Sequence, residues 1–260
     1  KSLKNSIFSF NYNDFESLKK IVKEKNIGVI KMEVKRNIEP QKNFLKKVQN
    51  LAKKENIVLI FDECSSGFRE TFGGIYKKYN LDPDMIVFGK ALGNGYAITS
   101  VLGKRNIMEN AKKTFISSTF WTERIGPTAA LKTLELMEKN KSWIQITNLG
   151  KKIKKRWLRV ATDHKVKINT WGIDAMPGFN FESKNNNIYK TFITQEMLKY
   201  RILATNNIYC SIAHNEKMFD NYFIKLNKIF KIINKFENDK LNPKSFLEGP
   251  ESITGLNRLN

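Results

Sequence analysis

Apolar and polar residues alternate along the first half of the chain in blocks typical of strands and helices. Short apolar runs at residues 27–32, 57–61 and 85–88 predict three β-strands. Apolar positions at helical spacing over residues 44–52 predict a helix between the first two strands, which makes a parallel βαβ unit. The run at 57–61 (IVLIF) is continuously apolar, so we expect that strand to be buried on both faces of an open α/β sheet.

Other segments complete the pattern. A capping box of Asn13 and Glu16 predicts a helix that contains Phe15, Leu18 and Val22. Two more helices are expected at 126–137 and 142–161, and two more strands at 97–103 and 115–117. Beyond residue 165, β-like pieces at 166–171, 175–181 and 208–212 alternate with helices near 191–204 and 216–236. We therefore expect a large α/β domain over residues 1–140, and a connecting helix with a small α+β domain over 141–260.

Charged residues follow the ends of the successive predicted strands. Glu33, Asp62 and Lys90 all stand there, and open α/β sheets bind ligands at that edge. A glycine-rich turn at 93–95 follows Lys90, and hydroxyls at 117–119 are able to bind a phosphate. A lysine, a carboxylate and phosphate donors together match the needs of pyridoxal 5'-phosphate: the amine forms a Schiff base with its aldehyde, and the carboxylate keeps its ring nitrogen protonated.

Two other kinds of site have less support. An apolar strand that ends in Asp62-Glu63 also occurs in P-loop ATPases, but the sequence contains no G-x-x-x-x-G-K-[ST] loop. That interpretation therefore requires a loop upstream of residue 1. His164 and His214 are the two histidines and have no ligand-spaced neighbours, so we predict no metal site.

Composition limits the partners. The 260 residues contain 46 Lys plus Arg against 25 Asp plus Glu, a formal net charge of +21. The basic residues are mostly lysine and are spread along the chain, so we do not expect a nucleic-acid partner. Basic residues concentrate at 139–167, which leaves a non-catalytic nucleic-acid-binding module as an alternative to a solvated helix face. No apolar run is long enough to cross a membrane, and two cysteines fit a reducing, cytoplasmic location.

Three long segments carry a specific resemblance. Residues 57–74 (IVLIFDECSSGFRETFGG), 83–103 (PDMIVFGKALGNGYAITSVLG) and 114–131 (TFISSTFWTERIGPTAAL) resemble class III pyridoxal-phosphate aminotransferases, in particular the branch that contains glutamate-1-semialdehyde 2,1-aminomutase. The resemblance implies the fold type I architecture and a homodimer.

The resemblance also assigns roles to residues. Lys90 matches the Schiff-base lysine and Asp62 the partner of the ring nitrogen. Thr119, with Ser118 beside it, matches the residue that reaches the cofactor phosphate of the neighbouring subunit. Glu33 and Asn37 are candidate substrate-pocket residues. Arg69 is able to bind a substrate carboxylate or to form a structural ion pair.

The implied activity is transfer of an amino group on a small amino acid, a semialdehyde or an amino-sugar-like molecule. An intramolecular aminomutase is the alternative. Family members are longer than this chain, and the part without a counterpart is their N-terminal half. Residues 1–140 then correspond to the C-terminal part of the cofactor-binding domain, and we expect the 260-residue chain alone to be inactive.

Overall fold

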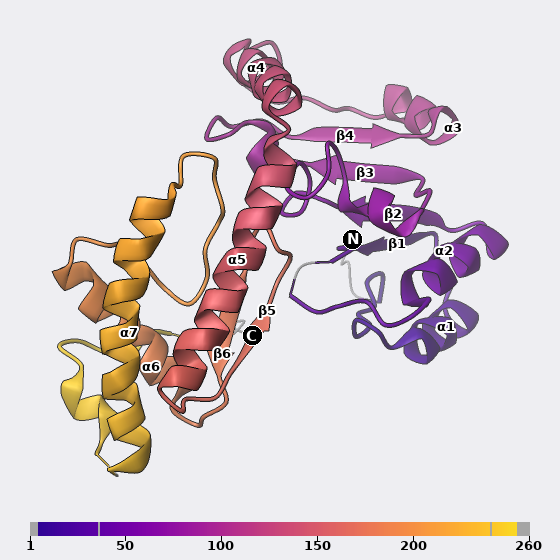
Figure 1. The fold of residues 1–260 in the computed structure, drawn as a ribbon. Helices are drawn as coiled ribbons and strands as arrows, with labels where there is room; N and C mark the ends of the chain where they lie inside the picture. Colours follow the sequence, from indigo (N-terminus) through magenta and orange to yellow (C-terminus); the bar gives the residue numbers. More distant parts are fainter. Residues whose placement is uncertain (1–4, 36, 240, 254–260) are drawn as a thin grey trace. The chain divides into compact units, whose positions relative to one another are not determined.

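The structure is a computed structural model that describes residues 5–35, 37–239 and 241–253. The chain divides into two compact units, Lys1–Ile144 and Gln145–Asn260. Each unit is described by itself, with the elements labelled in Figure 1.

The first unit is built on a four-stranded sheet with the order β1-β2-β3-β4 (Figure 1). The strands are β1 (Val29–Met32), β2 (Val58–Asp62), β3 (Met85–Phe88) and β4 (Ser100–Gly103). β1, β2 and β3 are parallel, and β4 runs antiparallel to β3. The parallel βαβ unit is thus confirmed, with α2 (Phe44–Lys54) as its crossover helix.

The two faces of this sheet differ in burial. On one face, which contacts α2, Ile30, Leu59 and Phe61 are all buried. On the other face, β1 exposes Val29 and Lys31, and β2 leaves its alternate residues half-buried. The expectation that the 57–61 strand is covered on both faces is therefore wrong for the part of the chain that the structure describes, because helices pack on one side.

The remaining helices of this unit are α1 (Phe15–Glu24), the short α3 (Arg105–Met108) and α4 (Ile125–Asn140). α1 is capped by Asp14, whose carboxylate accepts the Ser17 N–H at 2.9 Å. The predicted cap, Asn13, instead uses its side chain to bind the backbone of Glu39 and Gln41. The strand expected at 115–117 is wrong, because that segment is an unpaired loop between α3 and α4.

The second unit packs helices on a two-stranded antiparallel sheet. It contains most of α5 (Ser142–Asp163), then β5 (Ile168–Trp171), β6 (Gly178–Phe181), α6 (Asn186–Lys199) and α7 (Glu216–Asn238). Trp157, Phe179 and Phe230 are fully buried at its centre. The strand expected at 208–212 is wrong, since that region offers only an isolated bridge from Asn207 to Gly178.

Gly150 in α5 gives a direct test of the packing in this unit. A Cβ added there would lie 1.6 Å from the carbonyl oxygen of Asp174, which is a backbone atom and therefore costly to displace. We expect Gly150→Ala to lower the free energy of unfolding by about 3 kcal/mol or more. Gly249→Ala is the control, because nothing lies within 4 Å of its added Cβ. Thermal unfolding of both variants tests this prediction. Equal melting temperatures would contradict the close packing of Gly150 against Asp174.

Hydropathy gives one further finding. Among the helices that the structure describes, none combines the length and the apolar character needed to cross a bilayer.

Candidate active site

Two parallel strands bring Asp62 and Lys90 to the same edge of the sheet. Asp62 is the last residue of β2, and Lys90 follows the end of β3 after Gly89. Glu33 follows β1 at this edge and is half-buried. Carboxyl ends of neighbouring parallel strands form the usual ligand edge of an α/β sheet. The structure therefore collects three charged residues that were predicted to follow the strand ends.

The Asp62 carboxylate is held by Cys64 and Lys31. Its Oδ1 accepts the backbone N–H of Cys64 at 3.1 Å, and its Oδ2 lies 3.1 Å from the ammonium nitrogen of Lys31. Burial by itself would raise the pKa of Asp62, but the Cys64 hydrogen bond and the Lys31 charge outweigh it, so the pKa lies below its usual value. Asp62 is therefore an ionised carboxylate at neutral pH, as a partner for a protonated ring nitrogen must be.

Lys90 is oriented by its backbone and by one hydroxyl. Its φ is +42°, in the left-handed region that side chains rarely adopt. Its Nζ donates to Ser65 Oγ at 2.5 Å. Ser65 lies three residues after Asp62, so the segment 62–65 joins the carboxylate to the amine.

That segment is anchored by a buried carboxylate. Glu63 is fully buried and accepts hydrogen bonds from Ser66 Oγ at 2.5 Å and from the N–H groups of Ile75 and Tyr76 at 3.1 and 2.9 Å. Burial raises the pKa of Glu63, although these donors act in the opposite direction. Because Glu63 points into the loop 66–76, it fixes the backbone from which Ser65 meets Lys90.

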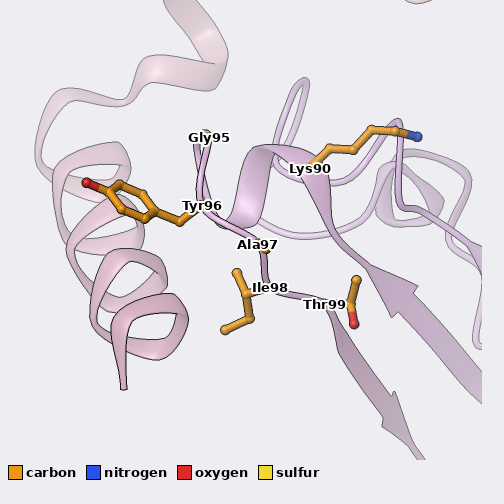
Figure 2. Close-up of a pocket in the computed structure, with 6 residues that line it drawn as sticks. All are labelled: Lys90, Gly95, Tyr96, Ala97, Ile98 and Thr99. Atoms are coloured by element: carbon orange, nitrogen blue, oxygen red, sulfur yellow. The ribbon is translucent and has the colours of Figure 1, made fainter. Parts of the chain in front are cut away.

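A cavity of about 700 Å³ opens beside Lys90. The turn that follows the lysine lines it, and Figure 2 shows Lys90 and Tyr96 extending in opposite directions from this turn. Gly93 closes the turn, since a Cβ there would lie 2.1 Å from the Tyr96 carbonyl oxygen. The other lining residues are Gly95, Ala97, Ile98 and Thr99.

The other predicted site residues lie in different surroundings. Ser118 and Thr119 stand on an exposed loop, where Ser118 Oγ accepts the N–H of Phe120 at 3.2 Å. Asn37 is exposed. Arg69 donates its Nε–H to the carbonyl of Ser65 at 2.9 Å, so it supports the loop next to Lys90. The described ranges contain no group of three or more His, Cys, Asp or Glu side chains placed to hold a metal ion.

Solved structures identify the fold as fold type I, the architecture of pyridoxal-phosphate-dependent transaminases. The FumI protein of Sphingopyxis sp. MTA144 matches 92% of this chain with a TM-score of 0.82 at 20% identity, over 60% of its own chain. The ornithine aminotransferase of Plasmodium yoelii matches 88% of this chain with a TM-score of 0.76 at 23% identity, over 63% of its own chain. The expected fold class is confirmed.

The sequence then gives the family. The model of the family "Aminotransferase class-III" matches residues 15–238, so the chain belongs to the class III aminotransferases. The 3-aminobutyryl-CoA aminotransferase of Cloacimonas acidaminovorans is 34% identical over 80% of this chain. The glutamate-1-semialdehyde 2,1-aminomutase of Sulfolobus acidocaldarius is 30% identical over 90% of it. The chain spans 52% and 60% of the lengths of these two relatives.

The cofactor that this family implies is pyridoxal phosphate, and the residues fit it. A lysine amine, an ionised carboxylate on the neighbouring strand and an adjoining cavity are groups that this cofactor uses. Sequence reasoning missed two residues of this arrangement. Ser65 had no distinguishing signal, whereas Lys31 had one, since it is the one residue with a polar side chain in the predicted strand 27–32.

Proposed function

We propose that this chain carries the lysine and the carboxylate of a class III aminotransferase that moves amino groups between small molecules. The proposal rests on one observation: the amine of Lys90 and the carboxylate of Asp62 are joined through the segment 62–65 at the ligand edge of a fold type I sheet. Substrates with a primary amine next to a carboxylate or an aldehyde fit the chemistry. The substrate named for the Sulfolobus relative, glutamate 1-semialdehyde, is of this class, whereas 3-aminobutyryl-CoA, named for the Cloacimonas relative, carries its amine one carbon further from the carbonyl.

Pyridoxal phosphate, when bound, supplies an aldehyde that combines with amines and a ring that accepts the electron pair of the neighbouring carbon. Asp62 holds the proton on the ring nitrogen. The Nζ atom of Lys90 would hold the cofactor and give way to the substrate amine. It would then take the proton from the amine-bearing substrate carbon and deliver it to the former aldehyde carbon of the cofactor. Ser65 keeps that Nζ atom in position between these steps, because its hydroxyl is already in contact with it.

We also propose that the enzyme works as a homodimer in which Ser118 and Thr119 bind the cofactor phosphate of the neighbouring subunit. The loop around them supports this, because its aromatic side chains are turned to solvent: Phe115 is 96% exposed, Phe120 is 74% exposed and Trp121 is 67% exposed. Several exposed aromatic residues on one loop are typical of an interface. Glu33, Asn37 and Arg69 remain our candidates for substrate contacts.

An intramolecular aminomutase is the second candidate, supported by the 30% identity with the Sulfolobus aminomutase. The two reactions differ in one requirement. A transaminase needs an added keto acid to accept the amino group, whereas an aminomutase returns the amino group to another carbon of the same molecule. Both use Lys90 and Asp62 in the same way.

Reconstitution tests the proposal. Because the chain spans 52% of the Cloacimonas relative, we expect the 260-residue polypeptide to bind pyridoxal phosphate weakly and to show no turnover alone. Co-expression with the segment of that relative outside the matched region is expected to restore turnover of an amino donor. Adding and omitting the keto acid then separates transaminase from aminomutase. A reconstituted protein that binds pyridoxal phosphate but turns over no amino compound would contradict the proposal.

A further inference from the structure

Lys31 is the residue on the exposed side of β1 that reaches the candidate active site. The register places Lys31 opposite Ile60, two residues before Asp62 on β2. Alternate strand residues share a face, so Lys31 and Asp62 lie on the same face of the sheet. The Lys31 ammonium extends along that face to within 3.1 Å of Asp62 Oδ2, and its side chain is 59% exposed.

This contact uses the atoms that a ring nitrogen would need. Asp62 Oδ1 already accepts the Cys64 N–H, and Oδ2 carries the Lys31 ammonium. A carboxylate oxygen is able to accept a second hydrogen bond, but a second cation placed on the same carboxylate is repelled by the first. Lys31 and a protonated ring nitrogen therefore compete for one negative charge.

Glu63 and Lys90, which flank Asp62, are engaged elsewhere. Glu63 points away, into the hydrogen bonds of the 66–76 loop, and the amine of Lys90 donates to Ser65. The thiol of Cys64 stays neutral, because burial and the charge of Asp62 raise its pKa. Among the side chains that the structure describes here, the cation in contact with Asp62 is Lys31.

We infer that Lys31 is a positioning residue that acts on the cofactor through Asp62: it neutralises the carboxylate while the ring is absent and weakens the hold of Asp62 on the ring nitrogen. The inference rests on the proposed function, since it takes Asp62 as the partner of the ring. It goes further by assigning a residue that limits cofactor affinity. An exposed ion pair of this kind is worth about a two- to fivefold change in affinity.

The direction of the change in pyridoxal phosphate affinity distinguishes competition from simple charge attraction. If Lys31 acted only as a nearby positive charge, its removal would weaken the binding of an anionic phosphate ester. Competition predicts the opposite, so Lys31→Met should bind pyridoxal phosphate about two- to fivefold more tightly. Lys31→Arg keeps the cation and should behave like the unchanged protein.

Lys104→Met is the matched control. Lys104 follows β4 and forms an exposed ion pair with Asp82 and Asp84 at 3.0 and 3.1 Å. Gly103 pairs with Met85 at the start of β3, so this ion pair lies at the opposite edge of the sheet from Asp62. This variant makes the same lysine-to-methionine change as Lys31→Met, and it should leave cofactor binding unchanged.

Two measurements on the 260-residue polypeptide test the inference. First, carbon NMR of the Asp62 carboxyl, without cofactor, should show its pKa rising in Lys31→Met and staying constant in Lys104→Met. Second, borohydride trapping of pyridoxal phosphate on Lys90, followed by mass spectrometry across a concentration series, should show the tighter binding. A deaza analogue with carbon in place of the ring nitrogen should show no gain in Lys31→Met.

Each result of these two measurements either supports or overturns the inference. An Asp62 titration that is the same in Lys31→Met would overturn the inference and leave the proposed function standing. A shifted titration with unchanged or weaker binding of pyridoxal phosphate would overturn the competition. An equal gain with the deaza analogue would do the same, because the ring nitrogen would not be involved. No trapping on Lys90 in any of the proteins would contradict the proposed function itself, and the inference with it.

Discussion

Lys90→Ala is expected to abolish the covalent capture of pyridoxal phosphate and to lower turnover of the reconstituted enzyme by about 10⁴-fold or more. The amine that bonds to the aldehyde carbon and moves the substrate proton is then missing. Alanine meets the same backbone penalty at a φ of +42°, so the fold should not change. The visible absorbance of the bound cofactor and borohydride trapping report the loss directly.

Lys132→Ala is the control for this variant. Lys132 is an exposed lysine of α4 whose ammonium lies 2.8 Å from Glu135, and it is not among the residues that line the cavity beside Lys90. Its removal should leave both absorbance and trapping unchanged. If instead the absorbance persists in Lys90→Ala and another lysine carries the trapped cofactor, the central assignment is wrong.

Asp62→Asn is expected to keep the cofactor bound and to lower turnover by about 10²- to 10³-fold. The amide has the shape of the carboxylate but lacks the charge that holds a proton on the ring nitrogen, so the ring becomes a poorer electron acceptor. The pKa of Asp62 lies below its usual value, so the unchanged protein keeps this charge well into the acid range. The stability contributed by the ionised form is lost only as the pH falls through that lowered pKa.

Asp82→Asn gives the matching control, since Asp82 is an exposed carboxylate paired with Lys104. The measurements are turnover of the reconstituted enzyme and the amount of cofactor bound per chain. Turnover near that of the unchanged protein in Asp62→Asn, with cofactor bound, would show that Asp62 is not the partner of the ring.

The strands of the sheet could be predicted from the sequence because buried parallel strands have a simple hydrophobic pattern. The runs that became β1, β2 and β3 are short, apolar and bounded by polar residues, and they end where charged side chains begin. The helices α2, α4, α5 and α7 follow apolar positions at helical spacing in the same way. The local sequence pattern is enough to predict a helix or strand whose apolar side chains form one continuous buried stripe.

The errors have a common physical cause. The segments 115–117 and 208–212 carry β-like residues, but a strand exists only with a pairing partner, and neither segment has a ladder to join. At α1, Asn13 and Asp14 are both able to cap, and Asn13 is occupied by the backbone of residues 39 and 41. Contacts with residues distant in the sequence determined these structures, and the local sequence holds no information about such contacts.

The same reason explains what was missed at the site. Asp62 and Lys90 were predictable because each stands just after an apolar run. Ser65 became part of the site through a bond across 25 positions, and Lys31 through the register of β1 against β2. Both depend on spatial neighbours that only the fold defines.

The backbone of Lys90 has a consequence for how this position can vary. A non-glycine residue held in the left-handed region costs about 1–2 kcal/mol, and glycine would remove that cost. The fold is therefore less stable with lysine here than it could be, and natural variation that favoured stability alone would replace it. Lys141, Lys165 and Arg201 also have a positive φ, so the strain by itself does not identify a functional residue. At residue 90 the cost coincides with the amine that we propose binds the cofactor.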